Sequence, residues 1–307
     1  MTLIYLIGGF SIGVGLLLSR RKGVSYSLLF LFLILQWTFT VYAYKNLNST
    51  RLEFFTFDSL GVLLLLALSV VAIPALFHSH LYLIRRKESL SLQAVYYAGI
   101  VSLITAISAA YLANNLAVIW IFTEITTLCI SVLIYHHRNK LALEGTWKYV
   151  FISAVSITFV FIGILFLSLS LHHAGSSDMS FANLVANAKQ LNPFWLRLAF
   201  LFIFTGFTVK LGLVPMFTAG VDAKDLAPAP AGALLASVLM NLGFVGVFRT
   251  YAILANTPLA NWASIVVGTS AFLSLFVATV YMIRVKNIKR MFAYSGIEHM
   301  EIGRAHV

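Results

Sequence analysis

Residues 60–77 read LGVLLLLALSVVAIPALF, an apolar run that contains no charged side chain. The run belongs to a longer apolar stretch that covers residues 57–82. About 20 apolar residues in a helix are needed to cross the hydrocarbon core of a bilayer. Because lipid offers no hydrogen-bond partners, such a segment must satisfy its backbone internally, as an α-helix does. The stretch therefore predicts a membrane-spanning helix.

Further apolar stretches bring the number of predicted spans to nine, and a tenth begins near Met291. The other eight cover residues 3–19, 24–44, 92–113, 115–135, 147–170, 195–217, 229–253 and 262–283. Of 307 residues, only 10% are charged, against about 25% in soluble domains. The predicted fold is an all-α, polytopic transmembrane helical bundle. We interpret the first run as a retained span because basic residues follow it rather than precede it.

The distribution of basic residues argues against nucleic-acid binding despite a net charge of +11. Lys and Arg lie in short clusters between apolar runs, as orientation signals do in membrane proteins. Alternate loops hold thirteen basic residues on one side and four on the other. The larger set is Arg20, Arg21, Lys22, Arg85, Arg86, Lys87, Arg138, Lys140, Lys224, Arg284, Lys286, Lys289 and Arg290, and the smaller is Lys45, Arg51, Lys189 and Arg197. The positive-inside rule predicts an inner (cytoplasmic) membrane protein with its N-terminus outside.

The sequence offers no set of cofactor or metal ligands. The one cysteine, Cys129, can form no internal disulfide and cannot supply the thiolates of an iron–sulfur cluster. His78 and His80 are two residues apart on a predicted helix and therefore face different ways. The remaining histidine pairs lie in loops, at His136-His137 and His172-His173. We expect no cofactor and no metal in this chain, and any redox centre would belong to partner subunits.

Ionisable side chains inside predicted spans are functional candidates, because burying them in a membrane costs several kcal/mol. Glu124 and Lys210 lie deepest, in the fifth and seventh predicted spans, whereas Lys148 and Arg249 lie near span ends. A carboxylate at such depth stays charged only if a cation or water approaches it. We therefore expect Glu124 and Lys210 to approach each other, directly or through a bridging water. The pair could act as a proton switch, and the alternative is a static ion pair.

The seventh predicted span also contains the signal for a broken helix. Residues 206–215 read GFTVKLGLVP. Pro215 removes a backbone donor, and Gly212 allows the chain to unwind. Broken helices in transporters occur where the backbone lines a cavity. We predict an interruption between Lys210 and Pro215, with unpaired backbone carbonyls that face the protein interior.

Several segments together resemble one known family. They are Asn114–Leu128, Glu144–Tyr149, Gly206–Arg249 and Ile288–Met300. From about Phe57 to Glu301, the chain resembles the antiporter-like membrane subunits shared by respiratory complex I, the multisubunit cation/proton antiporters and the membrane-bound hydrogenases. Within the family, Asn241 and the sequence IEHM at residues 297–300 resemble component F of hydrogenase-4 and its formate-hydrogenlyase relatives.

The resemblance implies a fold of about fourteen helices with two inverted repeats, each containing a broken helix. Residues 1–90 would form the three N-terminal helices, residues 91–255 the first repeat, and residues 256–301 the start of a truncated second repeat. The closing residues 302–307 resemble the translation of a sequencing adapter, and we expect them to be an artefact.

The resemblance assigns ion translocation to Glu124, Lys148 and Lys210, but the chain departs from the family after Pro215. The family usually continues Met-His-x-Trp-Leu-Pro-Asp-Ala-His, whereas residues 216–224 read MFTAGVDAK. Both histidines, the tryptophan and the second proline are replaced. The secondary candidates are Asp222, which is retained, Lys224, Asn241, which cannot titrate, and Arg249.

The expected function is that of a membrane subunit, without redox chemistry of its own, that moves protons or sodium ions in a redox-driven complex of the hydrogenase-4 or NADH:quinone oxidoreductase type. Its expected partners are other membrane and redox subunits and the lipid bilayer. Two alternatives remain open. One is a subunit of a sodium/proton antiporter or an inorganic-carbon uptake system without redox partners, and the other is a structural remnant that does not conduct.

Overall fold

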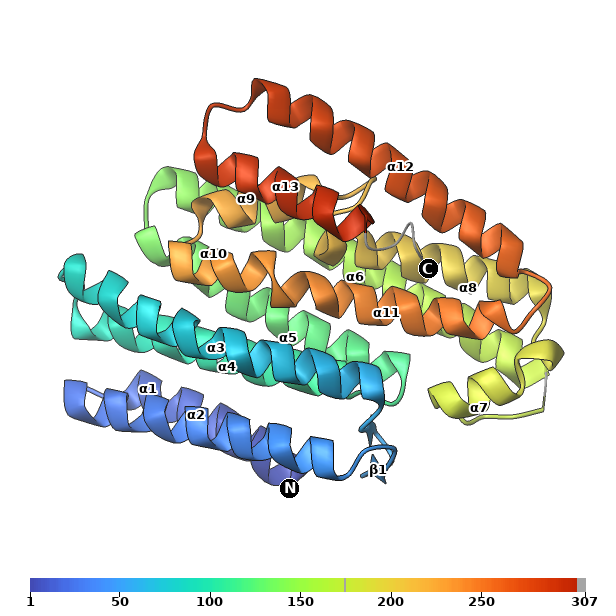
Figure 1. Ribbon diagram of the computed structural model, residues 1–307, viewed down its shortest axis with the longest axis horizontal. Coiled ribbons are helices and arrows are strands. Elements are labelled where there is room, and N and C mark those ends of the chain that lie inside the picture. Colours follow the sequence, from blue (N-terminus) through green and yellow to red (C-terminus); the bar gives the residue numbers. More distant parts are fainter. Residues whose placement is uncertain (174, 303–307) are drawn as a thin grey trace.

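The structure is a computed structural model that describes residues 1–173 and 175–302, with side chains described up to residue 297. Long helices lie side by side and form a bundle, as Figure 1 shows. The described residues contain one small sheet, the antiparallel pair β1 (Thr50–Arg51) and β2 (Phe55–Thr56). The prediction of an all-α bundle is therefore confirmed. Residues 303–307, which include most of the suspected artefact, lie outside the described residues.

In the described chain, eight helical segments are long and apolar enough to cross a membrane, and a shorter apolar helix precedes them. Every predicted span corresponds to helical structure, so the chain is a multi-pass membrane protein. The long helices are α1 (Thr2–Leu18), α2 (Lys22–Lys45), α3 (Ser59–Arg85), α4 (Leu90–Tyr111), α5 (Leu116–Ile134), α6 (Lys140–His173), α8 (Pro193–Leu211), α11 (Val238–Ala255) and α12 (Ala260–Arg284). The shorter ones are η1 (Tyr135–His137), α7 (Phe181–Ala186), η2 (Ala188–Gln190), α9 (Thr218–Leu226), α10 (Ala229–Ala236) and α13 (Ile288–Ile302).

The predicted seventh span is interrupted where the sequence indicated. Helix α8 ends at Leu211, and Gly212 follows in the left-handed region with a φ of +79°. Its N–H donates to the carbonyl of Thr208 at 2.8 Å. A left-handed glycine is a common end to a helix because it has no Cβ to clash. The peptide bond between Val214 and Pro215 is cis, and helix resumes as α9.

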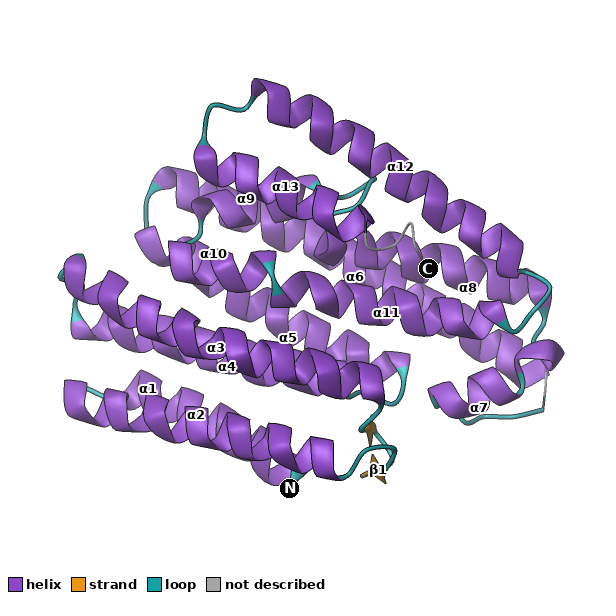
Figure 2. Cartoon of the chain, in the orientation of Figure 1, coloured by secondary structure: helices purple, strands orange, loops and turns teal. Residues whose placement is uncertain are grey.

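The predicted eighth span is also divided, which the sequence did not indicate. Ser237 separates α10 from α11, and the gap is visible between these helices in Figure 2. The Ser237 hydroxyl donates back to the carbonyl of Ala233 at 2.7 Å. Two interruptions therefore lie close together in the chain, on either side of α9.

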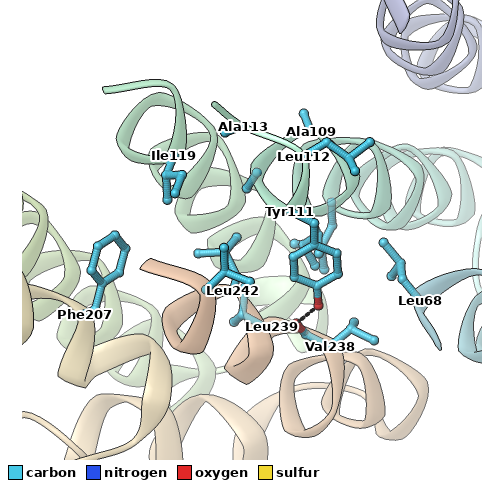
Figure 3. Packing of buried hydrophobic residues seen from close by; sticks show 14 of the residues in the cluster. Leu68, Ala109, Tyr111, Leu112, Ala113, Ile119, Phe207, Val238, Leu239 and Leu242 are labelled. Atoms are coloured by element: carbon cyan, nitrogen blue, oxygen red, sulfur yellow. Dashed lines mark hydrogen bonds between the residues drawn. The ribbon is translucent and has the colours of Figure 1, made fainter. Parts of the chain in front are cut away.

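Helix α4 forms the centre of the bundle, with 72% of its most apolar window buried, against 17% for α12. Near the end of α4, the buried Tyr111 donates a hydrogen bond to the carbonyl of Val238, next to Leu239 and Leu242 (Figure 3). Tyr111 thus joins the start of α11 to the core. Helix α12 lies at the edge of the bundle opposite α1 and α2 (Figure 1).

A buried polar network joins the N-terminal helices to α4. The hydroxyl of Tyr5 in α1 donates to Gln36 Oε1 at 2.5 Å and lies 3.0 Å from Ser108 Oγ. Gln36 in turn donates to Ser69 Oγ of α3 at 2.9 Å. Polar contacts of this kind hold helices together in lipid, where the hydrophobic effect between helices is weak.

Candidate ion-translocation site

Lys210 lies in the last turn of α8 and is 6% exposed. Its Nζ donates to Thr127 Oγ1 and to the Tyr149 hydroxyl, both at 2.8 Å. The ammonium of this α8 residue therefore contacts side chains of α5 and α6. The break after Leu211 supports this placement, because the C-terminal end of a helix carries partial negative charge that favours a cation.

Glu124 lies one helical turn before Thr127, so the two side chains share a face of α5. Its Oε2 is buried and has no hydrogen-bond partner in the described structure. The carboxylate interacts electrostatically with Lys210 and Tyr149. Among the ion pairs of the described residues, however, none joins Glu124 to Lys210 within 4.0 Å. The direct contact is not formed, and contact through a bridging water stays a prediction.

An unpaired carboxylate oxygen in a protein interior is costly. Buried polar groups without a protein partner are commonly satisfied by ordered water. The Oε2 atom of Glu124 is therefore a place where we expect water between α5, α6 and α8. Such a water would connect the carboxylate to the groups around Lys210.

A small cavity lies beside Lys210. Its walls include Lys210 and Tyr149, Gly212 at the break, and Gly220 and Lys224 of α9. The space is about the size that a single water molecule needs. The interruption between α8 and α9 thus brings two lysines to the walls of one cavity.

Lys224 is 9% exposed, and its Nζ lies 3.1 Å from the sulfur of Met240. An ammonium has three donors, whereas a thioether is only a weak acceptor. The expectation that Lys224 is a loop charge is wrong, because Lys224 lies in α9 and is buried inside the bundle. Lys224 occupies the position of the final histidine in the family motif, so a titratable side chain is retained there.

Lys148 does not reach this site. Its side chain is 52% exposed and pairs with Glu144, one turn earlier in α6, at 2.5 Å between Nζ and Oε1. The next residue, Tyr149, points inward and contacts Lys210 instead. The site residue in this segment of α6 is therefore Tyr149.

Arg249 belongs to a separate buried network at the end of α4. Its guanidinium pairs with Asp58 Oδ1 at 2.7 Å and donates to the carbonyls of Tyr111, at 2.9 Å, and Ala113. It therefore ties α11 to the start of α3 and the end of α4. Asn241, one of the secondary candidates, is half-buried beside the Tyr111 hydroxyl.

The backbone at the break is more fully paired than predicted. The Val214 N–H donates to Ser274 Oγ at 2.8 Å. The Val214 carbonyl accepts from the Ser270 hydroxyl at 2.9 Å. The expectation of unpaired carbonyls is therefore wrong for Val214, because two serines of α12 reach across to this peptide unit.

Sequence reasoning missed Thr127, Tyr149 and the α12 serines. Thr127 could have been found, because it lies three residues after Glu124 and so on the same helix face. Tyr149 and the serines carried no comparable signal, because their role depends on which way α6 and α12 turn in the bundle. No group of three or more potential metal ligands comes together among the described residues.

The comparisons with known proteins agree with this architecture. A sequence profile described as NADH:quinone oxidoreductase/Mrp antiporter, transmembrane, matches residues 113–303. The chain is 27% identical over 257 residues to a hydrogenase-4 component F homolog of Methylacidiphilum infernorum (isolate V4), covering 81% of this chain and 54% of the relative. It is 26% identical over 247 residues to hydrogenase-4 component B of Escherichia coli (strain K12), covering 80% of this chain and 35% of that relative. It thus spans about half the length, or less, of these relatives.

Two solved structures share the fold. The membrane-bound sulfane sulfur reductase, an archaeal respiratory membrane complex, contains a chain that superposes with a TM-score of 0.81 at 17% identity, covering 98% of this chain and 62% of that one. Respiratory complex I from Thermus thermophilus contains a chain that superposes with a TM-score of 0.77 at 16% identity, covering 99% of this chain and 63% of that one. The profile match extends over more than half of the sequence. The chain therefore belongs to the NADH:quinone oxidoreductase/Mrp antiporter family of membrane proteins.

Proposed function

We propose that this chain is a proton-translocating subunit of a redox-driven membrane complex of the hydrogenase-4 or NADH:quinone oxidoreductase type. One observation carries the proposal. Buried Lys210 donates to Thr127, one turn from Glu124 on α5, and to Tyr149, and it shares a small cavity with Lys224. Ionisable residues inside membrane proteins mark proton and ion pathways. Here Glu124, Lys210 and Lys224 could act one after another along such a pathway.

Protons fit this site better than sodium ions. Sodium is held by oxygen ligands and by half-helix carbonyl ends, whereas two lysines line this cavity and would repel a cation. An amine can instead release a proton to water and accept one again. Two ammonium groups that face the same small space disfavour each other's charged form. A proton that leaves Lys210 through the cavity water would therefore be accepted by a neutral Lys224 amine.

Glu124 would control this transfer. While its carboxylate is ionised, it stabilises the charged form of Lys210, and the proton stays. A change in a partner subunit that protonates Glu124, or moves it away, would remove that stabilisation and favour transfer to Lys224. The chain itself would contribute no redox centre, so the partners would be the redox and other membrane subunits of the complex.

We also propose that the protein lies in the cytoplasmic (inner) membrane with its N-terminus outside. The uneven distribution of basic residues between alternate loops supports this orientation. Lys224 is buried and no longer belongs to the cytoplasmic set, but twelve of the thirteen residues remain.

The experiment is redox-driven proton uptake by the whole complex in sealed vesicles, with electron transfer and assembly measured on the same preparations. Lys210→Met should abolish uptake while the complex still assembles. Lys189→Met, which alters an exposed lysine of η2, is the matched control and should leave uptake unchanged. Normal uptake by assembled Lys210→Met would refute the proposal and favour the structural remnant. Uptake in vesicles without redox substrate, driven by a sodium gradient, would favour the antiporter alternative.

A further inference from the structure

Helix α9, which carries Lys224, is held against α13 by its own apolar cluster. Val221 of α9 packs in a group with Ala278 of α12 and with Ala293, Tyr294 and Ile297 of α13, apart from the main core. An isolated helix as short as α9 is not stable by itself. Its position must therefore be set by its neighbours.

Charged and polar groups reinforce this contact, and we call them the α9–α13 clasp. Its members are Asp222, Asp225, Asn287, Lys289 and Arg290. Arg290 pairs with Asp222, and its Nε lies 3.7 Å from Asp225 Oδ2. Asn287 donates to Asp225 Oδ1 at 2.9 Å, and Lys289 donates to the carbonyls of Asp225 and Ala227 at 3.4 and 3.3 Å.

The two aspartates of the clasp flank Lys224 closely in sequence, and α13 also covers Lys224 in space. A Cβ built on Gly296 would lie 3.8 Å from Lys224 Nζ and 3.9 Å from the sulfur of Met240. A Cβ on Gly212, at the break, would lie 3.0 Å from Cγ1 of Ile297. One face of α13 therefore closes over both the break and the buried lysine.

Arg290 is the member that connects both aspartates, and its side chain is 43% exposed, compared with 23% for Asp222 and 16% for Asp225. A single pair at this degree of exposure contributes little to overall stability. The effect is instead local, because both acceptors lie on the short helix that carries Lys224. Loss of the arginine would leave two neighbouring carboxylates at the α9 end to repel each other.

We propose that Arg290 is a positioning residue that, through Asp222 and Asp225, fixes α9 against α13 and so holds the Lys224 ammonium at the cavity shared with Lys210. The effect on ion movement rests on the proposed function, whereas the effect on the α9–α13 contact does not.

The test measures both effects in the assembled complex. A cysteine in place of the buried Val221, introduced together with Cys129→Ser, reports how often α9 separates from α13 through its rate of reaction with a membrane-permeant thiol reagent. Proton uptake is measured in parallel with Val221 retained. The variants are Arg290→Gln and the charge exchange Asp222→Arg with Arg290→Asp. Lys286→Gln, which alters an exposed basic residue of the same connection, is the control.

We expect Arg290→Gln to raise the labelling rate about fivefold, as loss of a partly exposed charge pair allows, and to lower proton uptake about tenfold, because small displacements of a working group cost much. The charge exchange should restore part of both, because it rebuilds the pair between positions 222 and 290 but not the contact with Asp225, and Lys286→Gln should change neither. Unchanged labelling in Arg290→Gln, or uptake equal to that of an active parent, would overturn the inference. Absence of uptake already in the parental chain would instead refute the proposed function, since labelling still reports the clasp.

Discussion

The Tyr149 hydroxyl lies 2.8 Å from the Lys210 ammonium, and the aromatic ring of the same tyrosine lies 5.1 Å from it. Taken together, the two distances place the ammonium at the hydroxyl end of the ring, where it binds the hydroxyl oxygen. Tyr149 also interacts with Glu124 and forms part of the wall of the cavity that reaches Lys224. Tyr149 therefore contacts Lys210 directly and lines the same cavity as Lys224.

Tyr149→Phe should slow proton uptake without preventing assembly. The substitution keeps the ring but removes a hydrogen-bond acceptor from a buried ammonium, at a cost of about 1.5–3 kcal/mol. We expect proton uptake to fall by roughly tenfold or more, since about 1.4 kcal/mol corresponds to a factor of ten. Tyr44→Phe is the matched control, because Tyr44 is 68% exposed on α2. Equal uptake by both variants would show that the hydroxyl has no part in the pathway.

Glu124→Gln should abolish coupling while the complex still assembles. Glutamine keeps the shape of the side chain but cannot ionise, so Lys210 loses its counter-charge. Folding should survive because, among the described residues, no direct ion pair joins Glu124 to Lys210, and glutamine is close to glutamate in size. The measurement is proton uptake driven by the redox reaction, alongside a native gel. Normal pumping by the assembled variant would leave the static-pair interpretation standing.

The sequence predicted the spans well because the property that defines them is local. An apolar run of about 20 residues must be helical in lipid whatever surrounds it. The break after Leu211 was also predictable, because Gly212 and Pro215 act on their own backbone.

The side-chain partners were less predictable because they depend on how each helix is rotated. Neighbouring residues on a helix point about 100° apart, so Tyr149 faces the core while Lys148 faces outward. Lys224 looked like a loop charge, since nothing local shows that a short polar helix re-enters the bundle. Its burial follows from contacts with α13, far along the chain.

Gly206→Ala should destabilise the protein by separating α6 from α8. A Cβ at this position would lie 2.4 Å from Cγ2 of Val160 and 2.7 Å from the carbonyl oxygen of Ser156. Overpacking of this kind typically costs about 1–3 kcal/mol. The expected result is a lower melting temperature in detergent and less assembled complex. Gly268→Ala on α12 meets open space and should be neutral or slightly stabilising in the same assay.

Arg249→Met should be more damaging to folding than to ion movement. It leaves Asp58 and the carbonyls of Tyr111 and Ala113 without their cation. Removing one partner of a fully buried pair costs about 3–5 kcal/mol, and because the Asp58 side chain is 38% exposed we expect about 2 kcal/mol. Arg249→Lys should recover part of this loss. Thermal unfolding of the purified protein is the measurement, and a melting temperature equal to that of the parent would contradict the assignment.

Lys224→His should retain proton uptake, whereas Lys224→Met should lose it. Histidine is the residue that the family motif usually has at this position, and either ring nitrogen can exchange a proton with cavity water. Methionine keeps a side chain of similar length without any proton to transfer.

Imidazole loses its proton near pH 6.5 and lysine near pH 10.4 in their ordinary states. The histidine variant should therefore work best at lower pH than the parent, since the carrier must be able both to accept and to release a proton. Uptake is followed in vesicles with equal amounts of assembled complex from about pH 6 to about pH 9, a range that includes the ordinary histidine pKa of about 6.5. If Lys224→Met pumps as fast as Lys224→His across this range, the amine at the cavity is not a proton carrier, and Lys210 must pass its proton by another route.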